Sequence, residues 1–185
     1  LNPQVDWREH IRALFARKVG TGSYNWRNPE RRAQDRDQPL YAPSRAGNGA
    51  GTIVVGVDTS GSIGPKILDM FFAEMAGILE DLQPQRIVIM WCDAKVGRVD
   101  EAEEAGDLNV IRGKGAPGGG GTAFEPVFTE VGKVGLEPDA LVYLTDGLGS
   151  FPKVAPSYPV IWGSIHCKPE HYPFGDVVMI EERAS

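Results

Sequence analysis

The stretch Thr52-Ile-Val-Val-Gly-Val-Asp-Thr-Ser-Gly-Ser62 joins a run of apolar residues to a short polar loop. A continuous apolar run of this length is typical of a strand that is covered on both faces, as in a parallel sheet. Behind the loop, residues 65–82 begin with a proline, which suits a first helical turn, and then repeat apolar side chains at helical spacing. The stretch therefore predicts a buried strand that leads through a polar loop into a helix.

Further strand-sized segments follow at helix-length intervals. We expect buried strands at residues 86–92, 140–145, 160–162 and 177–180, a hairpin strand at 95–99, and a short helix at 124–134. Between the hairpin and that helix we expect an acidic surface turn at 100–107 and a short extended piece at 108–111. Strands that alternate with helices predict an α/β fold with a mainly parallel sheet and helices on both faces.

The first 50 residues differ in character from the rest. Residues 2–19 predict a short amphipathic helix with Asp6 and Glu9 at capping-box spacing, and residues 20–48 predict an irregular arm that is rich in arginine. Residues 1–47 hold nine Lys and Arg against five Asp and Glu, whereas the remainder holds ten against twenty. We therefore expect a basic helix and arm (1–50) that packs on an acidic body (51–185).

Length and composition exclude several classes of protein. The chain has 185 residues, of which 42% are hydrophobic and 24% charged, as in an ordinary globular domain. Its longest apolar runs are strand-sized, far below the about 20 residues of a membrane helix, so we expect no membrane span. The chain begins at Leu1 without a visible leader, which we interpret as a processed chain or a part of a longer protein.

The two cysteines, Cys92 and Cys167, are too few for a disulfide framework, so we expect a reducing, cytoplasmic setting. In a doubly wound sheet of strand order 3-2-1-4-5-6 they would lie three strands apart, which is roughly 14 Å. A disulfide requires Cα atoms within about 7 Å. We predict two free thiols that are buried near strand ends.

Oxygen-bearing side chains cluster in three loops, residues 58–64, 115–122 and 146–150, which the predicted sheet places at its carboxyl edge. In the first loop Asp58, Ser60 and Ser62 alternate, so an extended backbone would point all three side chains the same way. Such ligands suit a hard cation and suit zinc or copper poorly. We expect Mg²⁺, with Mn²⁺ or Ca²⁺ as alternatives. A competing interpretation is that Asp58 and Ser60 cap the helix that follows.

The other two loops favour the metal interpretation. Thr122 follows four consecutive glycines, and such a run suggests that the backbone closely approaches another group. Asp146 follows the strand at 140–145 directly, so its carboxylate belongs to the same edge of the sheet. All three loops would then supply oxygen atoms to one site.

Together, Asp58-x-Ser60-x-Ser62, Thr122 and Asp146 resemble the metal-ion-dependent adhesion site of von Willebrand factor A (VWA) domains. The resemblance covers about residues 52–180 and implies a Rossmann-like, doubly wound sheet with a bound divalent ion. It implies that Ser60, Ser62 and Thr122 bind the ion directly, that Asp58 and Asp146 act largely through water, and that a partner protein's carboxylate completes the ion's shell. The chain differs from larger members in having one clear helix between the hairpin and the strand at 140–145.

A second resemblance concerns the first 50 residues. Trp7-Arg8-Glu9, followed by Tyr24-Asn-Trp-Arg-Asn-Pro-Glu-Arg-Arg32, is similar to the segment that precedes the A-like domain in bacterial proteins with an upstream zincin-type metallopeptidase domain. That resemblance implies a MoxR-type AAA+ ATPase as a partner. The sequence itself holds no His-Glu-x-x-His motif, because its three histidines are isolated. We therefore expect no catalytic residue in this chain.

These observations predict a non-catalytic protein-binding domain that depends on a divalent metal and recruits an acidic partner. One alternative is a regulatory or substrate-presenting domain of a metallopeptidase that works with a AAA+ ATPase. Another is an RNA-binding module, in which Tyr24, Trp26 and nearby arginines stack on bases. The acidic body argues against a nucleic-acid surface there.

Overall fold

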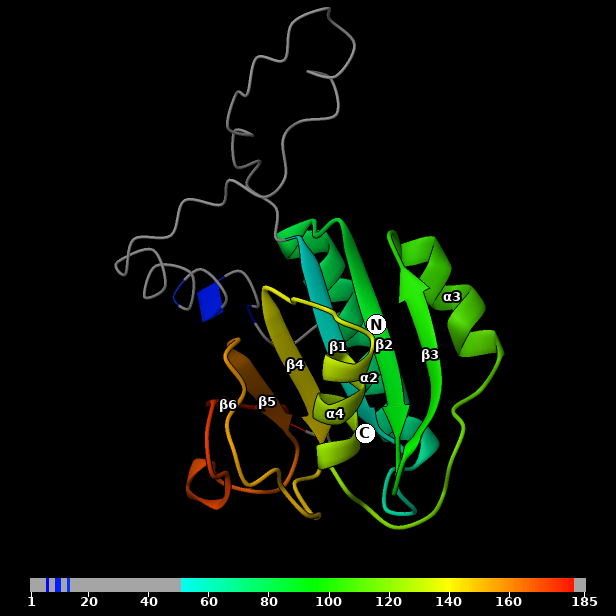
Figure 1. Cartoon of the computed structure of the whole chain (residues 1–185). Helices are drawn as coiled ribbons and strands as arrows, with labels where there is room; N and C mark the ends of the chain where they lie inside the picture. The colour runs from blue at the N-terminus through cyan, green and yellow to red at the C-terminus, as the bar shows by residue number, and fades with distance from the viewer. Residues whose placement is uncertain (1–5, 7–8, 11–12, 14–50, 182–185) are drawn as a thin grey trace, which may run out of the picture.

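The computed structural model describes residues 51–181 and, near the N-terminus, residues 6, 9, 10 and 13 (Figure 1). The Glu9 N–H donates to Asp6 Oδ1 at 3.0 Å, which agrees with the predicted cap. Residues 9, 10 and 13 are helical, whereas the other residues of the predicted helix and the arm at 20–48 lie outside the described residues. The division into units at 1–50 and 51–185 stays a prediction.

In the described part of the chain, a six-stranded sheet has the order β3-β2-β1-β4-β5-β6 (Figure 1). The strands are β1 (Thr52–Asp58), β2 (Arg86–Cys92), β3 (Val96–Ala102), β4 (Ala140–Thr145), β5 (Val160–Ser164) and β6 (Asp176–Met179). β3 pairs antiparallel with β2, and the other four pairs are parallel. This arrangement confirms the predicted α/β fold with a Rossmann-like, mainly parallel sheet.

Helices cover both faces of this sheet. α2 (Pro65–Leu82) and α3 (Ala105–Gly113) place Phe71 and Leu108 in one buried cluster with Val55 of β1. α4 (Glu125–Lys133) places Val127 in a second cluster with Val54. Successive strand residues point to opposite faces, so a continuous apolar strand serves both clusters. Figure 1 shows α4 in front of the sheet and α2 behind it. Within residues 51–181, no helix is long and apolar enough to cross a bilayer.

The prediction for residues 100–111 was wrong. β3 continues to Ala102, and residues 105–113 form α3 where we expected a turn and an extended piece. Leu108 and Ile111 are three residues apart, and a helix brings both to the same buried face. Two helices, α3 and α4, therefore lie between the hairpin and β4, rather than the one that the sequence indicated.

The start of α3 explains why this polar segment becomes a helix. Glu104 and Asp107 form a reciprocal capping box, in which the side chain of each residue accepts the backbone N–H of the other. Such a box satisfies two of the N–H groups that the first helical turn leaves without partners. The buried pair of apolar residues then holds the helix against α2 and β3.

Both cysteines are free thiols, as predicted. Cys92 is buried at the end of β2, and burial raises the pKa of its thiol to about 11. Cys167 follows β5 and is only half-buried, so the expected burial holds for Cys92 alone. In the sheet order β2 and β5 are separated by β1 and β4, which keeps the two thiols apart.

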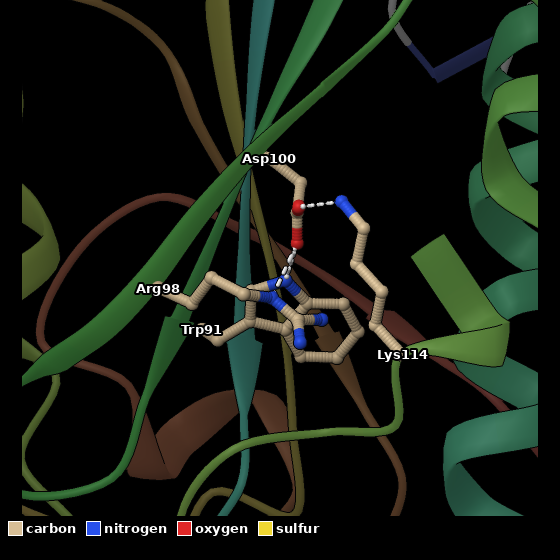
Figure 2. A network of polar contacts seen from close by, with 4 residues as sticks. All are labelled: Trp91, Arg98, Asp100 and Lys114. Carbon is tan, nitrogen blue, oxygen red and sulfur yellow. Dashed lines mark hydrogen bonds and ion pairs between the residues drawn. The ribbon is translucent and has the colours of Figure 1, made fainter. Parts of the chain in front are cut away.

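A polar network anchors β3 to the rest of the domain (Figure 2). The buried carboxylate of Asp100 accepts hydrogen bonds from Trp91 Nε1 at 2.8 Å, Arg98 Nε at 2.5 Å and Lys114 Nζ at 3.0 Å. Burial by itself would raise the pKa of the Asp100 carboxyl. The hydrogen bonds from Lys114, Trp91 and Arg98 outweigh burial and lower that pKa below its usual value. The network therefore favours the charged carboxylate.

Asp100→Asn should reduce the free energy of unfolding by about 1–2 kcal/mol near neutral pH, because charge-assisted hydrogen bonds are lost. The pKa of Asp100 is lowered in the folded state, so its stabilisation is present above the unfolded-state pKa. It is lost as the pH falls through the lower folded-state value. Urea unfolding of wild type and variant at neutral pH and in acid measures this change.

Glu101→Gln is the matched control, since Glu101 pairs with Arg86 at an exposed position, with side-chain exposures of 55% and 38%. An exposed pair contributes little, so we expect a change below about 0.5 kcal/mol. An Asp100→Asn effect that does not vary with pH, or that equals the control, would contradict the role assigned to Asp100.

Candidate functional site

The three oxygen-bearing loops lie together at the carboxyl edge of the sheet. Asp58 is the last residue of β1, and Asp146 follows β4, which pairs with β1 in parallel register. The strand order runs outward from β1 in one direction and from β4 in the other, so the sheet has its switch point between these two strands. Ligands of open α/β sheets bind outside such a point.

Asp58 is fully buried and held by two hydrogen bonds. Its Oδ1 accepts the Ser60 N–H at 2.9 Å, and its Oδ2 accepts the Thr145 hydroxyl at 2.7 Å. α2 instead begins after Gly64, and no side chain caps it. The alternative in which Asp58 and Ser60 cap this helix is therefore wrong, and the Asp58 carboxylate serves the loop itself.

Ser60, Ser62 and Asp146 form a continuous chain of oxygen atoms. Ser60 Oγ lies 3.0 Å from Ser62 Oγ, and Ser62 Oγ donates to Asp146 Oδ2 at 2.5 Å. The alternating hydroxyls thus face the same side, as the spacing predicted. Ser60 and Asp146 are buried, whereas Ser62 is exposed, so the chain of oxygens reaches solvent at Ser62.

Thr122 lies in the neighbouring loop and is held through its backbone. Its carbonyl accepts the Ser150 N–H at 3.4 Å, and Phe124 N–H donates to the Ser150 carbonyl at 2.9 Å. The Thr122 methyl group lies against Gly149, where a Cβ would come within 2.6 Å of it. Among the described residues, the hydrogen-bonded chain of Ser60, Ser62 and Asp146 does not include the Thr122 hydroxyl. The structure therefore brings Thr122 to the edge of the site without joining it to the other four residues.

The glycine run makes the close backbone approach that its sequence predicted. Gly119 N–H donates to the Thr59 carbonyl at 2.9 Å, and a Cβ at Gly118 would lie 2.5 Å from Thr59 Oγ1. Gly118 also has a φ of +115°, a conformation that favours glycine. The loop that carries Thr122 thus packs directly on the loop that carries the serines.

Two further residues, Thr145 and Asp93, position the site, and neither was among the predicted site residues. Thr145 holds Asp58 from the adjacent strand and also accepts the Gly147 N–H at 3.0 Å. The Asp93 carbonyl accepts the N–H of Ala123, the residue after Thr122, at 2.8 Å. Both residues stand at the carboxyl end of a buried strand. The rule that selected Asp58 and Asp146 could have placed both residues at this edge, but it could not have given the contacts that they make there.

The Asp93 carboxylate also stabilises the turn after β2. Its Oδ1 accepts the N–H groups of Ala94 at 2.5 Å and Lys95 at 3.2 Å. Slight burial acts to raise its pKa, but backbone hydrogen bonds, those from Lys95, Ala94 and Gly120 among them, lower it overall. Asp93 therefore links the β2–β3 turn to the glycine loop.

Two buried carboxylates, Asp58 and Asp146, act on each other at this site, and a bound cation would offset the cost of their charge. Burial raises the pKa of the Asp58 carboxyl, and the charge of Asp146 adds to this effect, although hydrogen bonds from Thr145 and Ser60 oppose it. Across residues 51–181, no group of three or more His, Cys, Asp or Glu side chains could hold a metal ion. A cation at this edge would depend on hydroxyl oxygens together with the two carboxylates. That donor set fits a hard cation such as Mg²⁺.

A Rossmann-like sheet with this site at its switch point defines the class of the protein, a doubly wound α/β domain. The family model of the VWA-like domain (DUF2201) matches residues 53–181, and the chain belongs to this family. A VWA-like domain is in general a protein-interaction domain. Neither among curated proteins nor among solved structures was a match to the chain found.

Thr145→Val should lower the free energy of unfolding by about 1–3 kcal/mol. Valine keeps the shape of threonine but leaves the buried Asp58 Oδ2 and the Gly147 N–H without their partner. Chemical denaturation in the presence of a chelator measures the effect without a contribution from metal ions.

Thr129→Val provides the control, because Thr129 is an exposed threonine of α4. Surface substitutions of this kind change stability by less than about 0.5 kcal/mol. If Thr145→Val were as stable as Thr129→Val, the buried hydrogen bond to Asp58 would not support the site.

Proposed function

We propose that this domain binds a partner protein through a divalent cation, Mg²⁺ or Mn²⁺, held by Asp58, Ser60, Ser62, Thr122 and Asp146. The observation that carries the proposal is the chain of oxygens from Ser60 through Ser62 to Asp146, which reaches solvent at the exposed hydroxyl of Ser62. When bound, the cation would supply a positive centre that attracts a carboxylate of the partner.

The arrangement of protons supports this use of the site. Ser62 donates its proton to Asp146, so its oxygen accepts the Ser60 hydroxyl with one lone pair and has the other lone pair left for a cation. Asp58 is held by Thr145 and by the Ser60 N–H, which fixes the loop on which both serines stand. Hydrogen-bond partners that hold a metal ligand in this way orient it and increase metal affinity.

The charge of the loops supports dependence on the cation. Residues 58–64, 115–122 and 146–150 contain two aspartates and no lysine or arginine. These loops offer an acidic partner no positive side chain, and the aspartates would repel it. Electrostatic attraction at these three loops would therefore come from the bound cation.

In this proposal the domain acts as a binding module rather than as an enzyme. Ser60 and Ser62 pair with each other and with Asp146, rather than with a histidine that could activate a nucleophile. The metallopeptidase context, a MoxR-type AAA+ partner and the cytoplasmic location stay predictions from the sequence.

Mg²⁺ and Mn²⁺ at millimolar concentration should raise the melting temperature of the wild-type domain, because an ion that binds only the folded state stabilises it by mass action. Ser62→Ala should lose this shift, and because it removes the hydroxyl that donates to the buried Asp146, its melting temperature in chelator should lie slightly below that of wild type. Ser157→Ala, at another exposed serine, should keep the full shift. Calorimetry that detects neither heat of binding nor a thermal shift in wild type would refute the metal site.

Asp58→Ala and Thr122→Ala should abolish recovery of a cellular partner in Mg²⁺ while the domain stays folded. Asp58→Ala leaves the buried Thr145 hydroxyl and the Ser60 N–H without their acceptor, so in metal-free buffer it should cost at least as much as Thr145→Val, about 1–3 kcal/mol. Thr122→Ala opens no large apolar cavity and should cost no more than about 1–2 kcal/mol. Pull-down with and without chelator provides the measurement. Equal recovery under both conditions by all variants would exclude a metal-bridged interface, and a steep salt dependence without a chelator effect would favour the RNA-binding alternative.

A further inference from the structure

Leu148 is an exposed apolar residue that lies directly beside the proposed metal site. Its side chain is 58% exposed, and its N–H donates to Asp146 Oδ1 at 2.8 Å. The other oxygen of the same carboxylate accepts the Ser62 hydroxyl. One carboxylate therefore fixes both the exposed hydroxyl and the backbone of the exposed leucine.

The two residues that flank Leu148 are packed tightly against the body of the domain. Gly147 has a φ of +84°, and a Cβ there would lie 2.6 Å from both Cys167 Cβ and the Tyr172 hydroxyl oxygen. On the other side, a Cβ at Gly149 would lie 2.8 Å from the ring of Phe124, which is fully buried. Since the backbone at both glycines is packed against the domain, the backbone of Leu148 is held between them, and its side chain is exposed to solvent.

Single exposed apolar residues are common on protein surfaces and need no special explanation. Val110 of α3 is such a residue, 66% exposed on a helix that packs beside β3. Leu148 differs because its position is set by the carboxylate of the proposed site and by two packed glycines. An exposed apolar side chain on a backbone that the site itself fixes offers a partner apolar surface in a set position.

We infer that Leu148 selects the partner, and that the partner segment carries an apolar side chain within two positions of the carboxylate that meets the cation. The inference rests on the proposed function and adds the chemistry of the partner to it. Leu148 would cover that side chain while the cation holds the carboxylate. The three loops lack Lys and Arg, so within these loops apolar contact with Leu148 is the attraction that adds to the cation.

A peptide library tests this inference. Heptapeptides with a fixed central glutamate and random flanks are selected on the wild-type domain in Mn²⁺ and eluted with chelator. We expect enrichment of leucine, isoleucine, valine, methionine or phenylalanine within two positions of the glutamate. Leu148→Ser should lose this preference and bind the selected peptides about 10-fold more weakly, with unchanged affinity for Mn²⁺ by calorimetry. Val110→Ser is the matched control and should behave as wild type.

The outcomes distinguish a failure of the role of Leu148 from a failure of the proposed function. Chelator-sensitive capture of peptides without an apolar preference, or an unchanged preference in Leu148→Ser, would overturn the role of Leu148 and leave the proposed function standing. Capture of no peptide in Mn²⁺, or capture that chelator does not reverse, would overturn the proposed function and this inference with it.

Discussion

The hydrogen bond from Thr145 Oγ1 to Asp58 Oδ2 ties the ends of β1 and β4 together in the interior of the molecule. Both side chains are fully buried, so neither can replace this contact with water. Asp58 also accepts the Ser60 N–H, and that bond sets the path of the loop that carries the serines. The hydrogen bonds that the buried Asp58 carboxylate accepts therefore also hold Ser62 in its place beside Asp146.

The remaining parts of the site are attached to this centre by backbone contacts. The glycine loop packs on Thr59, and the segment after Thr122 is held between the Asp93 carbonyl on one side and Ser150 on the other. Phe124 then enters an aromatic cluster, with ring centroids 5.1 Å from Tyr143 and 5.6 Å from Trp162. The site is thus continuous with the core beneath α4, and its loops have little freedom to move separately.

Much of the fold and the composition of the site could be predicted from the sequence, because both depend on local pattern. Apolar runs identified the buried strands, and Asp58 and Asp146 were selected because each stands at the carboxyl end of one. α3 was missed because only Leu108 and Ile111 of this polar stretch are buried apolar positions, and packing against α2 decides their conformation. The role of Thr145 depends on the register of β4 with β1, which no local pattern specifies.

Anomalous X-ray scattering from crystals of the domain grown in Mn²⁺ would show whether a divalent cation binds at this edge of the sheet. We expect one strong manganese peak within coordination distance of Ser60 Oγ and Ser62 Oγ, with the carboxylates of Asp58 and Asp146 around it. Well-ordered crystals in saturating Mn²⁺ with no peak near these oxygens would contradict a cation-dependent function for the domain.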